Sequence, residues 1–393
     1  MSTSDATQQP SPSGGWSEAM VTLAQAHVVP PTINALVQPS GVLYADGTYC
    51  QQGALWRRYR PISTEPAKPE TAGPVLNGRW LWGGVLWAHF GHFLVESTAR
   101  LWALAELHRP VDGIVFVPKR PDSDAGIRGF QQDFIHQIAP DLPIKLVTEP
   151  TQISELVVPG QGFGLGEIVT GTAKFRNAIH SKFARDIKPE GPDRIYLSRS
   201  KLGLGKGGLI GEEELEDRLT REGYEIFHPQ DHSLDVQLAR YKAARQVVAA
   251  DGSALHLYAM VGRPDQKVAM ILRRQSGANV QLVRNVQAFC KCDPLVINAL
   301  RTEWLPMAKQ RSSRMSFGEL DHKIIGAALA EAGFISRDAD WQAVTGRKRR
   351  MMLNQKGIRV DDNFVESPEF KQKRIRANRK RRRAERAARG ETS

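Results

Sequence analysis

The sequence predicts an α/β protein made of two Rossmann-type, doubly wound domains that face a cleft, with a disordered N-terminal leader and a basic helical C-terminal tail. Short β-branched runs alternate with helical segments from about Leu76 to Leu272, a spacing typical of βαβ units and parallel sheets. The alternation restarts after the polar segment 188–193, KPEGPD, which therefore separates the two units. Ligands of such folds bind where the strands end.

The elements follow in order along the two units. The first unit has expected strands at 113–117, 144–147 and 155–158, and expected helices at 88–108, 130–138 and 172–187. The second unit has expected strands at 194–198, 224–227, 246–250 and 267–272, and expected helices at 212–222, 234–244 and 255–261. A glycine-rich loop is expected at 203–208, and a further helix at 315–333.

With 393 residues the chain can hold two or three domains. The expected divisions are a disordered leader (1–20), an N-terminal α/β domain (21–188), a C-terminal α/β domain (189–300), a helical extension (301–370) and a basic tail (371–393).

The net charge of +12 is concentrated at the C-terminus. Residues 371–393 carry eleven Lys and Arg against two Glu, which gives +9 and leaves +3 for the rest of the chain. Such a segment can bind an anionic membrane surface or nucleic acid, whereas a helix that only aids solubility is the alternative. Because no nucleic-acid-binding motif precedes the tail, nucleic acid is the less favoured partner.

Cysteine use and hydropathy bear on the compartment. The three cysteines, Cys50, Cys290 and Cys292, lack the spacing of a four-ligand zinc site and fit a reducing environment. No run of about 18 apolar residues predicts a membrane-spanning helix, and the polar leader is not a secretory signal. The sequence therefore predicts a cytoplasmic protein, peripheral at the inner face of the membrane if its tail binds lipid.

The segment Trp80–Trp102 places four polar side chains in an apolar sequence. If a helix begins near position 88, then His89, His92, Glu96 and Arg100 lie at offsets 0, 3, 7 and 11 and share one stripe. Because buried ionisable groups cost free energy unless they are partnered, this stripe predicts a lined cleft. The alternative is a core helix with backbone-satisfied polar groups, in which Arg100 pairs with Glu96 at i, i+4.

Two strand-to-helix turns of the second unit carry groups that bind anions. Ser198 and Arg199 end a strand and precede the glycine-rich loop that contains Lys206. Glycines let a ligand approach the backbone, and arginine offers a bidentate fork to phosphate. The turn Asp251-Gly252-Ser253-Ala254 opens the next helix, whose amides can hold a diphosphate or a ribose. A flexible loop and a simple helix cap are the alternatives.

Three landmarks in this order resemble glycosyltransferase family 61, the DUF563-type enzymes that include bacterial capsule and exopolysaccharide proteins. They are GHFLVESTARLW at 91–102, RIYLSRS at 194–200, and the stretch from EEELEDRLTREGYEIF to ADGSALH at 212–256. The family pattern has a His, an acidic residue and Arg-Leu, then Ser-Arg, an Asn-Glu-x-Glu helix, a Gln in the next helix (here Gln237) and a Gly-x-x-Gly-Ala-x-Leu turn. The resemblance covers roughly 76–275.

The resemblance implies a GT-B-like pair of Rossmann-type domains. It also implies a nucleotide-sugar donor, most often UDP-linked, and inverting transfer to a saccharide or other hydroxyl acceptor without an obligatory metal or other cofactor. The chain departs from the pattern at two positions, because Gly211 precedes Glu212 where the family has Asn-Glu, and Asp251 stands in the family's His-Gly-Ala turn. We therefore expect a sugar preference that differs from that of typical family members. The alternative is that the protein is a catalytically inactive relative of these enzymes.

Inverting transfer needs a base for the acceptor hydroxyl and positive charge for the departing diphosphate. The N-terminal domain is then the acceptor side, with Glu96 or His92 as the base. The C-terminal domain binds the nucleotide sugar, and its expected donor-binding residues are Ser198, Arg199, Lys206, Asp251, Gly252, Ser253 and Ala254. The residues expected in acceptor-side or supporting roles are His89, Arg100 and Gln237.

Two other interpretations remain open at this point. Asp338-Ala339-Asp340 has the DxD pattern of metal-dependent GT-A enzymes, but it lies in a polar stretch beyond both units, so we expect a surface loop there. The other class of function is a non-catalytic adaptor that binds a membrane surface or nucleic acid through the tail.

Overall fold

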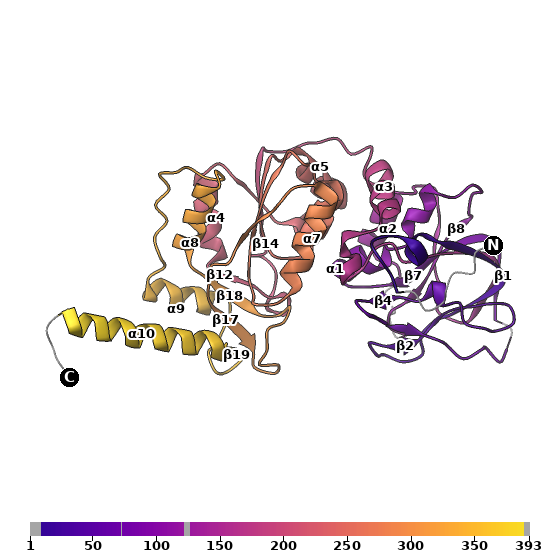
Figure 1. Cartoon of the computed structure of the whole chain (residues 1–393), viewed down its shortest axis with the longest axis horizontal. Coiled ribbons are helices and arrows are strands. Elements are labelled where there is room, and N and C mark those ends of the chain that lie inside the picture. Colours follow the sequence, from indigo (N-terminus) through magenta and orange to yellow (C-terminus); the bar gives the residue numbers. More distant parts are fainter. Residues whose placement is uncertain (1–8, 72, 122–125, 389–393) are drawn as a thin grey trace.

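The computed structural model describes residues 9–71, 73–121 and 126–388. Two α/β units lie side by side, and a small third sheet with the long helix α10 extends beyond the second unit (Figure 1). The mixed α/β class predicted from the sequence is confirmed.

The first unit is built on a six-stranded mixed sheet with the order β3-β1-β10-β7-β8-β9. Its strands are β1 (Met20–Val29), β3 (Gly41–Leu43), β7 (Val75–Leu86), β8 (Gly113–Pro118), β9 (Ile144–Leu146) and β10 (Thr151–Pro159). Strands β10, β7, β8 and β9 run parallel, whereas β1 is antiparallel to both of its neighbours. The three strands predicted for this unit are therefore confirmed as β8, β9 and β10.

Shorter elements surround this sheet. Two-residue strands form two pairs, β2 (Gln38–Pro39) with β6 (Ser63–Thr64) and β4 (Trp56–Arg57) with β5 (Arg60–Pro61). The helices and helical turns are η1 (Gly15–Glu18), η2 (Gln51–Gly53), α1 (Phe90–His92), η3 (Phe93–Ser97), η4 (Leu101–Ala105), α2 (Gly129–His136), η5 (Glu167–Thr170) and α3 (Ala173–Lys182).

The single helix predicted over 88–108 is wrong, because the segment consists of α1, the π-helical turn η3 and the 3-10 turn η4. The Ser97 hydroxyl donates to the carbonyl of Val85 (2.8 Å) and accepts from the amide of Trp87 (2.9 Å). The Thr98 hydroxyl binds the Leu94 carbonyl (2.7 Å). These bonds tie the segment to the end of β7 and compete with a regular helical ladder.

The described part of the predicted disordered leader is ordered. Trp16 in η1 is 4% exposed, and the Glu18 carboxylate accepts a hydrogen bond from the backbone amide of Lys174 (2.9 Å). Burial of a tryptophan stabilises this segment against the sheet. Residues 1–8 of the predicted leader lie outside the described residues.

The second unit is a five-stranded sheet with the order β13-β11-β14-β15-β16, in which all neighbours are parallel. Its strands are β11 (Arg194–Leu197), β13 (Glu225–Phe227), β14 (Gln246–Ala250), β15 (Lys267–Ile271) and β16 (Leu295–Ile297). Its helices are α4 (Glu212–Arg221), α5 (Leu234–Ala243), α6 (Ala254–Val261), α7 (Ala278–Cys290) and α8 (His322–Glu331), with the 3-10 turns η6 (Leu204–Lys206) and η7 (Pro229–Asp231).

Helices cover both faces of this sheet. Val247 of β14 packs in the same cluster as side chains of α5, α6 and α7, whereas its neighbour Val248 packs with α4 and α8. Adjacent residues of a strand face opposite sides, so the sheet is buried on both faces. The second unit is therefore doubly wound, as predicted.

A third sheet lies beyond the second unit, with the order β12-β18-β17-β19. Its strands are β12 (Gly208–Ile210), β17 (Leu300–Pro306), β18 (Phe317–Leu320) and β19 (Phe364–Glu366), and α9 (Gly346–Gln355) packs beside them. The helical extension predicted over 301–370 thus contains three strands, and the helix predicted over 315–333 begins only at His322. Trp304, Phe317 and Phe364 of these strands pack in one buried cluster with Met352 and Leu353 of α9, and this packing stabilises the sheet.

Helix α10 (Pro368–Ala388) carries the basic tail and projects away from the rest of the molecule (Figure 1). Its helical character confirms the prediction for the described part of the tail. Residues 389–393 lie outside the described residues. Over the described ranges, every helix is too short or too polar to span a bilayer.

One hydrophobic cluster joins the two α/β units. Phe163 and Phe175 of the first unit stack at 4.7 Å between ring centroids, and Phe289 of α7 lies 5.4 and 6.0 Å from them. The cluster continues into β14 and β15 of the second sheet. The units therefore share a core.

Candidate active site

The carboxyl ends of β11 and β14 define the candidate site. The strand order reverses between these two strands, which is the topological switch point where α/β sheets bind ligands. Ser198 and Arg199 follow β11, and the turn Asp251–Ala254 follows β14. The two loops predicted to bind the donor are therefore neighbours.

Arg199 is a largely buried cation folded over the following loop. Its Nη2 donates to the carbonyls of Lys206 (3.0 Å) and Gly207 (3.3 Å), and its buried Nε has no partner among the described residues. Its Nη1 lies 3.0 Å from the position that a Cβ on Gly252 would occupy. Burial, followed by the nearby Arg273, lowers the pKa of Arg199 to about 10.

Arg273 joins the turn after β14 to the third sheet. Its Nε donates to the carbonyl of Asp251 (2.9 Å), and its Nη1 donates to the carbonyl of Arg314 (3.1 Å). The buried Asp251 carboxylate lies 2.7 Å from the same Nε but is not aligned for a hydrogen bond, so the contact is an ion pair only. Gly207 (φ 63°) allows the Lys206 loop to lie against the turn before β18, because a Cβ at this position would come 2.4 Å from the Arg314 carbonyl.

These cations form what we call the basic cluster, which consists of Arg199, Lys206, Arg273, Arg274 and Arg314. Burial and Arg273 also lower the pKa of Arg274, whose buried Nε has no partner in the described structure. Asp251 is the carboxylate paired within the cluster. Several cations in a partly buried site attract an anion strongly, and arginines suit phosphate.

Ser198 and Glu212 form the floor beneath Arg199. The buried Glu212 carboxylate accepts from the Arg199 amide (2.8 Å) and the Tyr196 hydroxyl (3.0 Å), and burial raises its pKa to about 7. The Ser198 hydroxyl donates to Glu216 (2.5 Å), so it supports the loop rather than facing a ligand. Gly211 has a φ of 88°, a conformation that glycine adopts at no cost and that asparagine also tolerates, which accounts for the departure at this position.

On the first unit, Arg57, His92 and Glu96 form a bonded group. The Arg57 guanidinium donates from Nε to Glu96 Oε1 (2.7 Å) and from Nη2 to Oε2 (2.6 Å). His92 Nδ1 lies 2.8 Å from Glu96 Oε2. The Glu96 side chain is fully buried, whereas the His92 side chain is 30% exposed. Of the two predicted bases, His92 is therefore the one that a substrate can reach.

Trp87 holds this group in place. The His92 ring stacks on the Trp87 ring with 4.7 Å between centroids, and the Arg57 guanidinium lies 4.7 Å from the same ring. With one ring nitrogen bound to Glu96 and one face on tryptophan, the imidazole has a fixed orientation. Nε2 is then the nitrogen that can exchange a proton with a substrate.

Arg100 and Gln237 lie outside this arrangement. Arg100 is buried and donates to the backbone carbonyls of Gln52 (2.9 Å), Ala54 (2.7 Å) and Pro159. The Arg100–Glu96 pair of the alternative interpretation is therefore absent, and Arg57 pairs with Glu96 instead. The break in the helix turns Arg100 away from the stripe. Gln237 on α5 donates to the His232 carbonyl (3.1 Å) in the loop before its own helix.

The two units meet at Gly91 and Ser253. A Cβ on Gly91 would lie 3.0 Å from Cβ of Ser253 and 3.6 Å from Cε1 of His89. The predicted acceptor-side segment thus contacts the predicted donor turn. The structure brings together His89, His92 and Glu96 with Arg199, Lys206 and the 251–254 turn.

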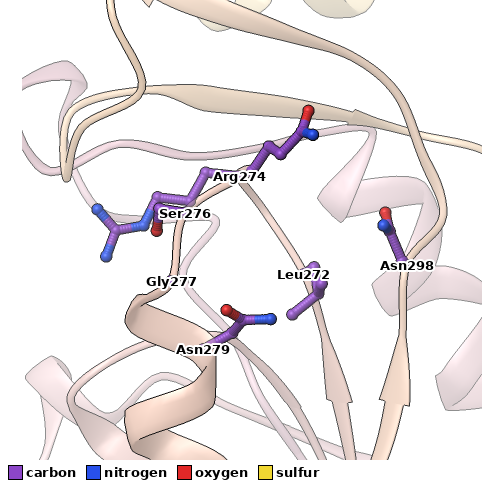
Figure 2. Close-up of a pocket in the computed structure, with 7 residues that line it drawn as sticks. Leu272, Arg274, Ser276, Gly277, Asn279 and Asn298 are labelled. Carbon is purple, nitrogen blue, oxygen red and sulfur yellow. The ribbon is translucent and has the colours of Figure 1, made fainter.

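A pocket of about 240 Å³ opens at the next strand ends, beyond β15 and β16 (Figure 2). It is lined by Leu272, Arg274, Gln275, Ser276, Gly277, Asn279 and Asn298. The Ser276 hydroxyl is buried without a partner among the described residues, and the side chains of Asn279 and Asn298 supply amides. The pocket therefore offers polar groups of both hydrogen-bonding types beside the basic cluster.

Asp338 and Asp340 lie in an exposed loop after α8, which agrees with the expected surface loop. The Asp340 carboxylate accepts from Gln342 (2.5 Å). Within the described ranges no three His, Cys, Asp or Glu side chains are grouped closely enough to hold a metal ion.

Comparison with protein families identifies one segment. Residues 90–269 match the model described as Glycosyltransferase 61, so the resemblance noted in the sequence is confirmed for these residues. No curated protein matches the chain. The matched segment includes His92, Glu96, Arg199 and the 251–254 turn, whereas Arg57 and Arg273 lie outside it.

Proposed function

Residues 90–269 belong to the glycosyltransferase 61 family, and we propose that the protein transfers a sugar from a nucleotide-sugar donor, UDP-linked, to a saccharide or other hydroxyl acceptor in polysaccharide synthesis. The transfer inverts the anomeric configuration and does not require a metal. The observation that carries the proposal is the basic cluster at the switch point, together with the contact of Gly91 and Ser253, which brings the segment of His92 and Glu96 against the 251–254 turn.

The donor would lie along the carboxyl edge of the second sheet. The diphosphate would bind the basic cluster between β11 and β14, and the nucleoside would extend towards the pocket beyond β15 and β16. Because neighbouring strands are about 4.8 Å apart, two strand spacings give about 10 Å, which suits the distance from a diphosphate to its base. Asn279 and Asn298 can then hydrogen-bond a nucleobase.

In the proposed step, the acceptor oxygen forms a bond to the anomeric carbon while the bond from that carbon to the diphosphate oxygen breaks. The hydroxyl proton passes to Nε2 of His92, and the nucleoside diphosphate leaves with the electron pair. Glu96 is a positioning residue: its carboxylate lies 2.8 Å from Nδ1, and in the proposed tautomer it accepts a hydrogen bond from that nitrogen and stabilises the imidazolium. Arg199, Arg273 and Lys206 stabilise the charge that develops on the leaving group.

Two arrangements are part of the proposal. The two α/β units act as a GT-B-like pair, with the acceptor on the first unit and the donor on the second. A location in the cytoplasm, at the inner face of a membrane, fits a tail whose charge is suited to anionic headgroups.

The test is calorimetric titration of the protein with UDP, GDP and CMP and with their sugars, with and without EDTA. We expect one nucleotide to bind with the same affinity in EDTA, and Arg199→Gln to weaken binding by at least about tenfold. The matched control is Arg194→Gln, since Arg194 is exposed at the opposite end of β11. Lack of binding by every nucleotide would contradict the proposal.

A second candidate function rests on α10. Residues 371–380 of this helix are exposed, and Arg374 contacts the body through Glu366 (2.6 Å). A non-catalytic adaptor would bind a membrane surface, or less favourably nucleic acid, through this helix alone. A protein shortened after Glu369 separates the two candidates: retained sugar transfer favours the enzyme, and loss of membrane or nucleic-acid binding in a protein without transfer activity favours the adaptor.

A further inference from the structure

His89 belongs to the first unit but faces the basic cluster of the second. It precedes α1, and its ring lies next to Gly91, where the two units touch at Ser253. Its Nδ1 is buried and has no hydrogen-bond partner among the described residues. A buried ring nitrogen without a partner is costly unless a ligand completes it.

The charged groups around His89 are mostly cations from the other unit. Its own segment contributes His92, and the second unit and its third sheet contribute Arg314, Lys206 and Arg199. Burial and then these groups, in that order, lower the pKa of His89 to about 4. At neutral pH His89 is therefore uncharged while no anion is bound.

We propose that His89 donates a hydrogen bond to the anion held by the basic cluster, and that it takes up a proton from solvent when this anion binds. The inference rests on the proposed function for the identity of the anion, the donor diphosphate. A diphosphate brings at least two negative charges and satisfies the unpartnered nitrogen, so it reverses the effect of the surrounding cations. As an imidazolium, His89 then adds a charged donor from the first unit to those that the basic cluster offers the leaving group.

This role differs from the acceptor-side or supporting role expected from the sequence. It makes diphosphate affinity depend on pH in a defined direction. Because the complex holds the proton more tightly than the unliganded protein, affinity rises as the pH falls from the raised pKa of the complex towards about 4. The anion also joins the two units, since its ligands come from both.

The experiment is calorimetric titration of the full chain at pH 7 with inorganic pyrophosphate and with UDP. Two buffers of different ionisation enthalpy give the number of protons taken up per ligand bound. We expect the wild type to take up more protons than His89→Gln, and the variant to bind about tenfold more weakly. The phosphate's own titration is the same for both proteins, so it cancels in the difference.

His108→Gln is the matched control, because His108 is exposed on the first unit. Thermal unfolding curves establish that both proteins are folded. Equal proton uptake by wild type and His89→Gln would then overturn the inference, and so would failure of both ligands to bind. If the protein transfers sugar but its proton uptake does not depend on His89, the proposed function holds and the inference about His89 is wrong. His89-dependent uptake with pyrophosphate, in a protein that binds no nucleotide, would support the anion site and overturn the transferase.

Discussion

Arg57 binds both carboxylate oxygens of Glu96, at 2.7 and 2.6 Å, from a hairpin 39 positions earlier in the chain. Burial alone would raise the pKa of Glu96, but hydrogen bonds from His92 and Arg57 outweigh burial and hold the pKa below its usual range. The buried carboxylate therefore stays ionised beside His92. This bidentate contact fixes the group on which the proposed proton transfer depends.

Removal of this guanidinium is the first prediction. In Arg57→Ala the buried Glu96 loses its main charge partner, so we expect a loss of about 3 kcal/mol in the free energy of unfolding and a much lower kcat. Urea denaturation and initial rates measure the two effects. Arg60→Ala is the control, because Arg60 is exposed on the same hairpin. Equal stability of the two variants would contradict the ion pair's role.

The second prediction concerns the loss of stability at acidic pH. Because the folded pKa of Glu96 is lowered, its contribution is complete above the unfolded value of about 4.5 and is lost as the pH falls through the folded value. Arg57→Ala raises the folded pKa, so its melting temperature should begin to fall at a higher pH than that of the wild type. Melting temperatures between pH 3 and 7 measure this difference, and Glu96→Gln should lack this contribution.

A buried histidine supplies the third prediction. His256 on α6 lies 2.8 Å from Asn285, and burial lowers its pKa to about 4. Between pH 6.5 and about 4 the unfolded chain binds a proton there that the folded chain does not, so stability falls by up to about 3 kcal/mol as the pH falls across this range.

His256→Gln retains a donor for Asn285 but does not titrate. We expect its unfolding free energy, measured in urea at several pH values, to depend less on pH between 6.5 and 4 than that of the wild type. A profile parallel to the wild type would show that His256 binds its proton equally in both states.

The contact between the two units gives the fourth prediction. In Gly91→Ala the new Cβ meets Cβ of Ser253 at 3.0 Å, so α1 or the 251–254 turn must shift by a few tenths of an ångström. Because rates depend steeply on the placement of reacting groups, even this small shift should lower the rate. We expect kcat/KM to fall while the melting temperature changes little.

Removal of the opposing atom provides the control for this variant. Ser253→Gly takes away the Cβ that the alanine meets, so the double variant Gly91→Ala/Ser253→Gly should be more active than Gly91→Ala alone. If the second change does not restore any activity, the spacing between the two segments is not what Gly91 provides.

The fifth prediction concerns α10. Each Lys or Arg near an anionic membrane contributes about 1 kcal/mol, and salt screens the attraction. We expect the full chain to sediment with vesicles that contain phosphatidylglycerol, and not with neutral vesicles or at high salt. The chain shortened after Glu369 should lose this binding and keep its transferase activity. Retained vesicle binding would assign the membrane contact to another surface.

Local sequence patterns predicted four of the five strands of the second sheet, three of the six strands of the first, and the two turns that meet at the carboxyl ends of β11 and β14. The runs at 194–198, 246–250 and 267–272 are β-branched and bounded by turn residues, so their strand character is local. The secondary structure of the segment after Ala88 was not predicted correctly, because the side chains of Ser97 and Thr98 bind backbone carbonyls and interrupt the regular helix.

Two residues of the site show what sequence reasoning missed. Arg57 lies in a short hairpin without periodicity, and nothing local links it to Glu96. Arg273 directly follows the predicted strand 267–272, at the sheet edge where Arg199 and Asp251 were already expected. A rule that collects charged residues at every strand end would have found Arg273, but no such rule finds Arg57.

The shared packing of Phe163, Phe175 and Phe289 has a consequence for motion. Domains joined by a polar, wet interface swing apart readily, whereas a continuous apolar core resists hinge bending. The two halves should therefore melt together in one cooperative transition. In the proposed reaction, substrates would then enter through side-chain and loop rearrangements at the edge of the site, within a largely preorganised fold.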